Sequence, residues 1–93
     1  MKIDSLKSVE LTIMPEHSEM KDGEIYISRV FSLAIHLCAC GCGEETVTPI
    51  DDGARGWTLS QGDNGVTLHP SIGNQNMPCK SHYWVQDGKI VWC

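Results

Sequence analysis

The amino-acid sequence predicts an all-β domain of the zinc-ribbon-like kind, built mainly from antiparallel hairpins and stabilised by one metal site. Three observations support this fold class. Apolar and polar residues alternate along several short segments, which is the pattern of half-buried strands. Turn pairs such as Asp87-Gly88 separate some of these segments, as in tight hairpins. Cysteines gather between Cys38 and Cys42 in a chain with only 6% aromatic residues, and small domains with thin cores commonly need a metal or disulfide.

The N-terminal half of the chain contains four expected strands. In the first, Val9, Leu11 and Ile13 lie on one face and polar residues on the other, which indicates a half-buried strand. A polar loop, in which a short helical turn is possible, leads to the second. The third and fourth predict a hairpin with the cysteine cluster at its tip. These strands are expected at Lys7–Met14, Glu24–Ser28, Val30–Cys38 and Glu45–Ile50.

The C-terminal half contains two further expected hairpins. The clearer one has Asp87-Gly88 between its strands, a pair suited to a primed two-residue turn. Between the two hairpins, we expect Pro70–Pro78 to form an irregular arm that leads to Cys79, because this segment is rich in glycine, asparagine and proline. The four strands are expected at Trp57–Gln61, Val66–His69, His82–Gln86 and Lys89–Trp92.

Length, charge and composition limit the kinds of protein to consider. A chain of 93 residues with 41% apolar content fits a single zinc-binding domain over residues 1–93. The formal charge of −5 opposes the attraction that drives nucleic-acid binding, so nucleic acid is not an expected partner. No apolar run approaches the roughly 20 residues of a membrane-spanning helix, and the N-terminus lacks the apolar core of a signal peptide. We therefore expect a cytoplasmic protein.

The cysteine cluster is the main candidate site. The sequence Cys38-Ala39-Cys40-Gly41-Cys42-Gly43 holds three thiols that are too close together for relaxed mutual disulfides, and Cys79-Lys80-Ser81-His82 holds two further ligand types. Structural zinc commonly takes two thiolate or imidazole ligands from one turn and two from a distant one. We therefore predict a Zn²⁺ ion bound by Cys40, Cys42, Cys79 and His82, with Cys38 as the alternative to Cys40.

Other interpretations of these residues remain open. Unliganded buried thiols and disulfide exchange are alternatives, although a polar turn flanked by glycines is a poor place to bury three thiols. His36 and Cys93 are further ligand candidates, and His36 is otherwise expected in the core or at a strand edge. His69 lies two residues before Ser71, but a histidine and a serine that are close in sequence are not a signal for a catalytic triad, so we expect a structural role.

Five motifs are informative together: Ala34–Gly43, Val47-Thr48-Pro49, the strand at Trp57, His69–Asn74 and Cys79–Trp84. They resemble a bacterial family of small Cys/His proteins over nearly the whole chain. Some members of that family are encoded beside genes for a ubiquitin-like protein, E1-like and E2-like enzymes and a JAB-type peptidase, in gene sets linked to antiviral defence. The resemblance implies a metal-binding accessory protein, with metal ligands among Cys38, Cys40, Cys42, Cys79 and His82, and it brings no known reaction.

Two functions follow from these features. We favour a zinc-stabilised accessory or protein-interaction module that docks onto a protein partner, such as a component of a ubiquitin-like conjugation system. The alternative is a small zinc metalloenzyme with an open coordination position, in which Glu44 or Glu45 acts as the base. A thiol-rich set of five available ligands indicates a closed metal site, and therefore favours the non-enzymatic module.

Overall fold

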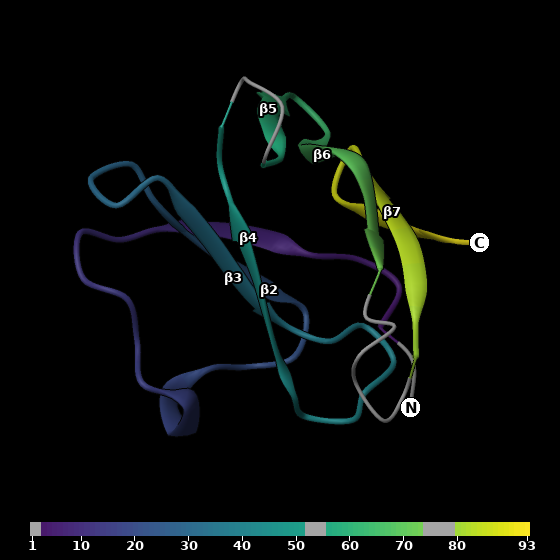
Figure 1. Cartoon of the computed structure of the whole chain (residues 1–93), viewed down its shortest axis with the longest axis horizontal. Coiled ribbons are helices and arrows are strands. Elements are labelled where there is room, and N and C mark those ends of the chain that lie inside the picture. Colours follow the sequence, from purple (N-terminus) through teal and green to yellow (C-terminus); the bar gives the residue numbers. More distant parts are fainter. Residues whose placement is uncertain (1–2, 52–55, 74–79) are drawn as a thin grey trace.

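The computed structural model of the chain describes residues 3–51, 56–73 and 80–93. Within these ranges the strands form two four-stranded sheets, with the orders β1-β2-β3-β4 and β5-β6-β7-β8. Figure 1 shows the N-terminal sheet in purple to teal and the C-terminal sheet in green to yellow. The predicted all-β class is confirmed. The strands are β1 (Lys7–Glu10), β2 (Glu24–Ser28), β3 (Leu33–Leu37), β4 (Glu45–Pro49), β5 (Thr58–Gly62), β6 (Gly65–Gly73), β7 (His82–Gln86) and β8 (Lys89–Trp92).

The N-terminal sheet contains the predicted hairpin with the cysteines at its tip. Strands β2, β3 and β4 are antiparallel in sequence order, whereas β1 pairs in parallel with β2. The first strand ends at Glu10 and not at Met14 as predicted, and Ile13 is 80% exposed. Strand β2 ends at Ser28, and the last backbone hydrogen bond between the two segments runs from the N–H of Leu11 to the carbonyl of Ile27, so among the described residues no strand pairs with the first segment beyond Leu11. The alternation of apolar and polar residues that predicted the strand therefore extends beyond Glu10, where the strand itself ends.

The third strand is also shorter than predicted, because the chain turns before it begins. Val30 and Phe31, which we expected in a strand, are 69% and 61% exposed in the turn after β2. Ser32 has a φ of 53°, in the left-handed region that a β-strand excludes. Strand β3 consequently starts at Leu33.

The C-terminal sheet confirms both predicted hairpins, β5–β6 and β7–β8. Asp87 and Gly88 both have positive φ values, 51° and 77°, as a primed two-residue turn requires. Strand β6, however, continues through Pro70 to Gly73, so the expected irregular arm does not begin at Pro70. The register shifts between Leu68 and Ile72, and such a bulge tolerates a proline, which cannot donate a ladder hydrogen bond. Residues 74–79 of the expected arm lie outside the described residues.

The main core lies between the two sheets. It contains Ile25 and Ile27 from β2, Leu68 and Ile72 from β6, and Tyr83 from β7, all at most 2% exposed. Removing such an apolar side chain from water contributes about 1.5–3 kcal/mol. A smaller cluster of Met20, Tyr26 and Leu37 lies apart from this core. The two sheets are therefore held together by side chains from their inner faces.

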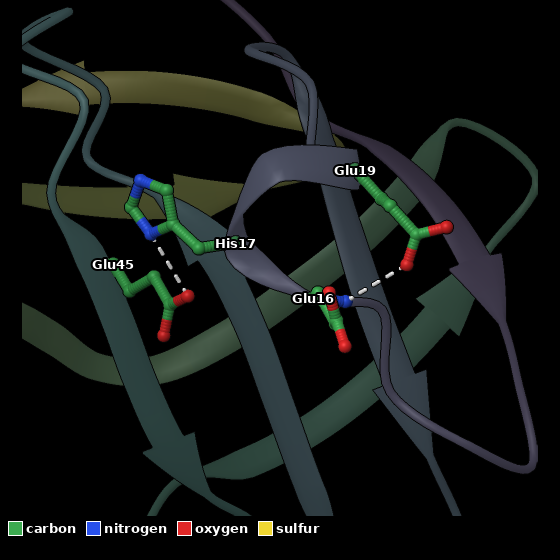
Figure 2. Close-up of polar contacts among 4 residues, drawn as sticks. All are labelled: Glu16, His17, Glu19 and Glu45. Carbon is green, nitrogen blue, oxygen red and sulfur yellow. Dashed lines mark hydrogen bonds and ion pairs between the residues drawn. The ribbon is translucent and has the colours of Figure 1, made fainter.

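A 3₁₀ turn, η1 (His17–Glu19), interrupts the loop between β1 and β2. The backbone N–H of Glu16 donates to Oε1 of Glu19 at 3.1 Å, and Nδ1 of His17 lies 2.9 Å from Oε1 of Glu45 on β4, as Figure 2 shows. The first contact closes the turn itself, and the second attaches the loop to the edge strand β4. No helix within the described ranges has the length and apolar character needed to cross a membrane.

Candidate functional site

The first part of the site is a cluster of three thiols at the tip of the β3–β4 hairpin. The Sγ atoms of Cys38, Cys40 and Cys42 all lie within 4.8 Å of one another, and those of Cys38 and Cys40 are 3.4 Å apart. Gly41 and Gly43 have φ values of 88° and 85°, a conformation that glycine adopts without strain and that allows this tight turn. Zinc–thiolate bonds of about 2.3 Å in a tetrahedron place the sulfurs roughly 3.8 Å apart. The spacing of these thiols therefore fits a thiophilic metal ion.

The cluster contains part of the predicted ligand set. Cys38, Cys40 and Cys42 are brought together, and Cys79 lies outside the described residues. Among the residues that the structure describes, the group of mutually close metal-binding atoms does not include His82, His36 or Cys93. The assignment of individual ligands stays a prediction.

Ser81 connects the thiol cluster to strand β7. Its Oγ lies 3.0 Å from Sγ of Cys38, and both residues are buried. Ser81 immediately precedes His82, the first residue of β7. The position of the thiol turn is therefore coupled directly to the strand that carries His82.

The second part of the site is a hydrogen bond between Ser71 on β6 and His82 on β7. Oγ of Ser71 lies 2.7 Å from Nε2 of His82 at an exposed position. His82 is paired with Gly73, so Ser71, two residues before Gly73, is its diagonal neighbour on the same face of the sheet. Ser71 itself lies within the irregular stretch between Leu68 and Ile72, and bulges of this kind often re-aim a side chain. A serine hydroxyl within hydrogen-bond distance of an imidazole nitrogen is the arrangement of a nucleophile and its base.

Sequence reasoning missed the Ser71–His82 pair. We considered His69 as the histidine near Ser71, because the two are close in sequence. The ring of His69 instead lies against Trp84, with centroids 5.7 Å apart and an interplanar angle of 33°. The histidine that contacts Ser71 lies 11 residues further along the chain. Only the pairing of β6 with β7 could have revealed it.

A second histidine–hydroxyl pair lies in the interior. Nε2 of His36 is 2.7 Å from the hydroxyl of Tyr83, which also accepts the backbone N–H of Ala39 at 3.4 Å. Burial lowers the pKa of His36 from its ordinary value of 6.5 to about 4, so this imidazole is neutral at physiological pH. The pair connects β3, the thiol turn and β7, and it is closed to solvent because both residues are 0% exposed.

The two carboxylates considered for a metalloenzyme lie near the thiol turn. Glu44 is exposed, and its carbonyl oxygen accepts the backbone N–H of Cys38 at 2.8 Å. The carboxylate of Glu45 is engaged with His17 (Figure 2). Neither carboxylate belongs to the group of mutually close metal-binding atoms in the described part of the chain.

Comparison with known proteins places the whole site within one family. Residues 11–93 match the model of a family described as "Bacterial ubiquitination-like system serine protease (BubE)". The matched range includes the thiol cluster, Ser71 and His82. No curated protein and no solved structure matches the chain. The expected resemblance to a family connected with ubiquitin-like conjugation is confirmed, and the chain belongs to this BubE family of a bacterial ubiquitination-like system.

Proposed function

We propose that this protein is a serine hydrolase of a bacterial ubiquitination-like system, with Ser71 as the nucleophile and His82 as the general base. The observation that carries the proposal is the 2.7 Å separation between Oγ of Ser71 and Nε2 of His82. The description of the family as a serine protease supports a peptide or related acyl bond as the target. Association with the ubiquitination-like system supports a polypeptide of that system as the substrate.

The proposed reaction is acyl transfer through a covalent intermediate. Oγ of Ser71 attacks the substrate carbonyl while Nε2 of His82 takes the hydroxyl proton. The bond between the carbonyl carbon and the leaving amine then breaks, and His82 returns the proton to that amine. Water attacks the acyl-serine with His82 again acting as the base, which releases the acid and restores Ser71. General base catalysis of this kind typically contributes 10²- to 10⁴-fold.

In this proposal the thiol cluster has a structural role. Cys38, Cys40 and Cys42 would hold a Zn²⁺ ion together with Cys79, which lies outside the described residues. The thiol-rich donor set is typical of closed structural zinc sites, where the ion supplies folding free energy. His82, one of the ligands that the sequence predicted, is assigned to Ser71 instead. A metal ion on Nε2 would occupy its lone pair, and a metal ion on Nδ1 would leave the proton on Nε2, so neither form could take the serine proton.

The thiol turn also supports the position of the proposed base. Ser81, just before His82, contacts Cys38, and Tyr83, just after it, contacts Ala39 of the same turn. Both neighbours of His82 are buried, whereas His82 is exposed. The exposed imidazole therefore extends from a backbone segment that is fixed on either side. Loss of the metal would displace this segment and slow the reaction without removing either reacting group.

A docking module within the same bacterial system is the second candidate function. The observation that favours it is the exposure of Val30 and Phe31, at 69% and 61%, in the turn between β2 and β3. Two adjacent apolar side chains on an exposed turn are suited to contact with a protein partner. The zinc metalloenzyme alternative is less well supported, because the carboxylate of Glu45 is engaged with His17.

Covalent labelling of Ser71 tests the proposed hydrolase. Purified protein is treated with a small alkyl fluorophosphonate, and peptide mapping by mass spectrometry locates the adduct. We expect modification of Ser71, and its loss in Ser71→Ala. Ser60, an exposed serine on β5 of the same sheet, provides the matched control Ser60→Ala, which should retain labelling. Folded wild-type protein that is not modified at Ser71 would contradict the proposal.

A metal assay tests the structural role separately. Elemental analysis of the purified protein should find one zinc ion per chain, and Cys40→Ser should lower both zinc content and melting temperature. Ser60→Ala is again the control and should leave both unchanged. Full zinc retention with an unchanged melting temperature in Cys40→Ser would remove Cys40 from the ligand set.

A further inference from the structure

The outer face of the C-terminal sheet carries apolar surface directly beside Ser71 and His82. Tyr83 and Val85 on β7 are 0% exposed. Because alternate residues of a strand point to opposite faces, His82 and Trp84 share the outer face. Trp84 is only partly buried, although it is the largest side chain on that strand. Trp84 therefore offers an aromatic surface two residues from the proposed base, on the same face of β7.

Trp84 belongs to a strip that crosses three strands. On one side it contacts the ring of His69 on β6, with centroids 5.7 Å apart. On the other side it is paired with Val91 on β8, which is 44% exposed. The strip of His69, Trp84 and Val91 thus runs alongside the Ser71–His82 pair on the same face.

The spacing of the strip suits one residue of an extended substrate. Side chains two positions apart on a strand are roughly 7 Å apart, and one residue of extended chain spans about 3.3–3.6 Å. A substrate residue within one or two positions of a carbonyl held at Ser71 is therefore close enough to reach Trp84 and Val91. The side chain of that substrate residue can cover the apolar surface of Trp84 and Val91. A polar side chain would lose its hydration there, so the surface favours an apolar one.

A hollow of about 430 Å³ continues from the strip toward the β7–β8 turn. Its lining is Asn64, Gln86, Asp87, Lys89 and Val91. Val91 belongs to both the strip and the hollow, so the two surfaces are continuous. The remaining lining residues supply hydrogen-bond donors and acceptors and charges of both signs. Such a surface suits the amide groups of a peptide backbone more than a second apolar side chain.

We propose that Trp84 and Val91 form a specificity subsite for an apolar side chain next to the cleaved bond of an extended polypeptide, and that the hollow holds the following polar residues of that polypeptide. This inference rests on the proposed hydrolase function. To that function it adds the kind of substrate that the site prefers: a polypeptide with an apolar residue next to the cleaved bond.

Substitution of Val91 tests the subsite with an internal control. Internally quenched peptides with Leu or Asp at each position flanking the cleaved bond measure the preference as a ratio of kcat/KM. Wild type should prefer Leu at one flanking position by about tenfold or more, as expected for burial of one apolar side chain. Val91→Asp should abolish that preference, and Val91→Leu should keep it. Val47→Asp, on β4 of the other sheet, is the matched control because Val47 is similarly exposed at 48%, and it should leave the ratio unchanged.

The same variants separate failure of the subsite from failure of the hydrolase. The small fluorophosphonate carries no peptide side chain for the subsite, so it should label Ser71 in Val91→Asp within twofold of the wild-type rate. Normal labelling with an unchanged Leu preference in Val91→Asp would overturn the subsite and leave the proposed hydrolase intact. Absence of labelling in wild type would overturn both.

Discussion

Two histidine–hydroxyl pairs in this protein have the same hydrogen-bond length and opposite surroundings. Nε2 of His36 lies 2.7 Å from the hydroxyl of Tyr83, and Nε2 of His82 lies 2.7 Å from Oγ of Ser71. The first pair is fully buried between the sheets, and the second is on the outer face of the C-terminal sheet. The comparison indicates that contact geometry alone does not identify a reactive site. Access and burial decide whether the imidazole exchanges protons or holds strands together.

The largest expected effect separates the two pairs by function. His82→Ala removes the proposed base and should slow fluorophosphonate labelling of Ser71 by about 10²- to 10⁴-fold, the range typical of general base catalysis. Because His82 is exposed, the melting temperature should change little. Both quantities are measured on the same preparation. A labelling rate that remains near the wild-type value would show that His82 is not the base.

The second expected effect is a pH dependence of stability that arises from His36. Its pKa is lowered to about 4 in the folded protein, whereas an unfolded histidine titrates near 6.5. Between these values the unfolded chain binds more protons, so stability is greatest above pH 6.5 and falls as the pH decreases toward 4. The shift corresponds to about 3 kcal/mol in the free energy of unfolding.

Urea denaturation of wild type and His36→Phe across this pH range measures the contribution. Carboxylates titrate in both proteins, so the difference between the two curves isolates His36. The difference should change by about 3 kcal/mol from pH 7 to pH 4. Parallel curves would mean that His36 is not held neutral by burial.

A smaller effect is expected from Tyr83→Phe. The substitution keeps the buried ring but removes the partner of His36 Nε2, and an unsatisfied buried polar group costs about 1–3 kcal/mol. Chemical denaturation should find a loss of that size. The labelling rate of Ser71 should fall at most several-fold, because the same hydroxyl also contacts Ala39 of the thiol turn. This loss is far smaller than the one expected for His82→Ala.

The smallest effect is expected from Ser81→Ala. Ser81 contacts Cys38 and precedes His82, so its loss should loosen the position of the base at a cost of about 1 kcal/mol in stability. The labelling rate should fall several-fold, and Ser60→Ala should change neither quantity. Equal rates in the two serine variants would show that the thiol turn does not position His82.

The sequence was sufficient for features that depend on local signals. The β7–β8 hairpin was predicted with its observed bounds because Asp87-Gly88 determines the turn. The cysteines were expected at a hairpin tip, where three of them lie. The assignment of Ile13 to a strand was wrong because alternation along a segment carries no information about where its neighbouring strand ends.

The Ser71–His82 pair shows what local signals cannot supply. Its members come from different strands, and they meet because β6 pairs with β7 through an irregular register. A proline inside the segment led us to expect that the strand ended at His69, which removed Ser71 from the sheet. In the folded protein the proline lies at the bulge in β6, where no ladder hydrogen bond from its nitrogen is needed. The bulge exists only because β6 pairs with β7, so the sequence of the segment alone could not reveal it.

The irregular register of β6 also constrains how the chain length can vary. Three residues of β6 lie between Leu68 and Ile72, opposite one residue of β7 between their partners Val85 and Tyr83. Deletion or insertion of one residue there would change the alternation of faces, so either Ser71 would leave the outer face or Ile72 would leave the core. Changes of length should therefore be rejected in this segment, because they would separate the proposed nucleophile from its base or open the core.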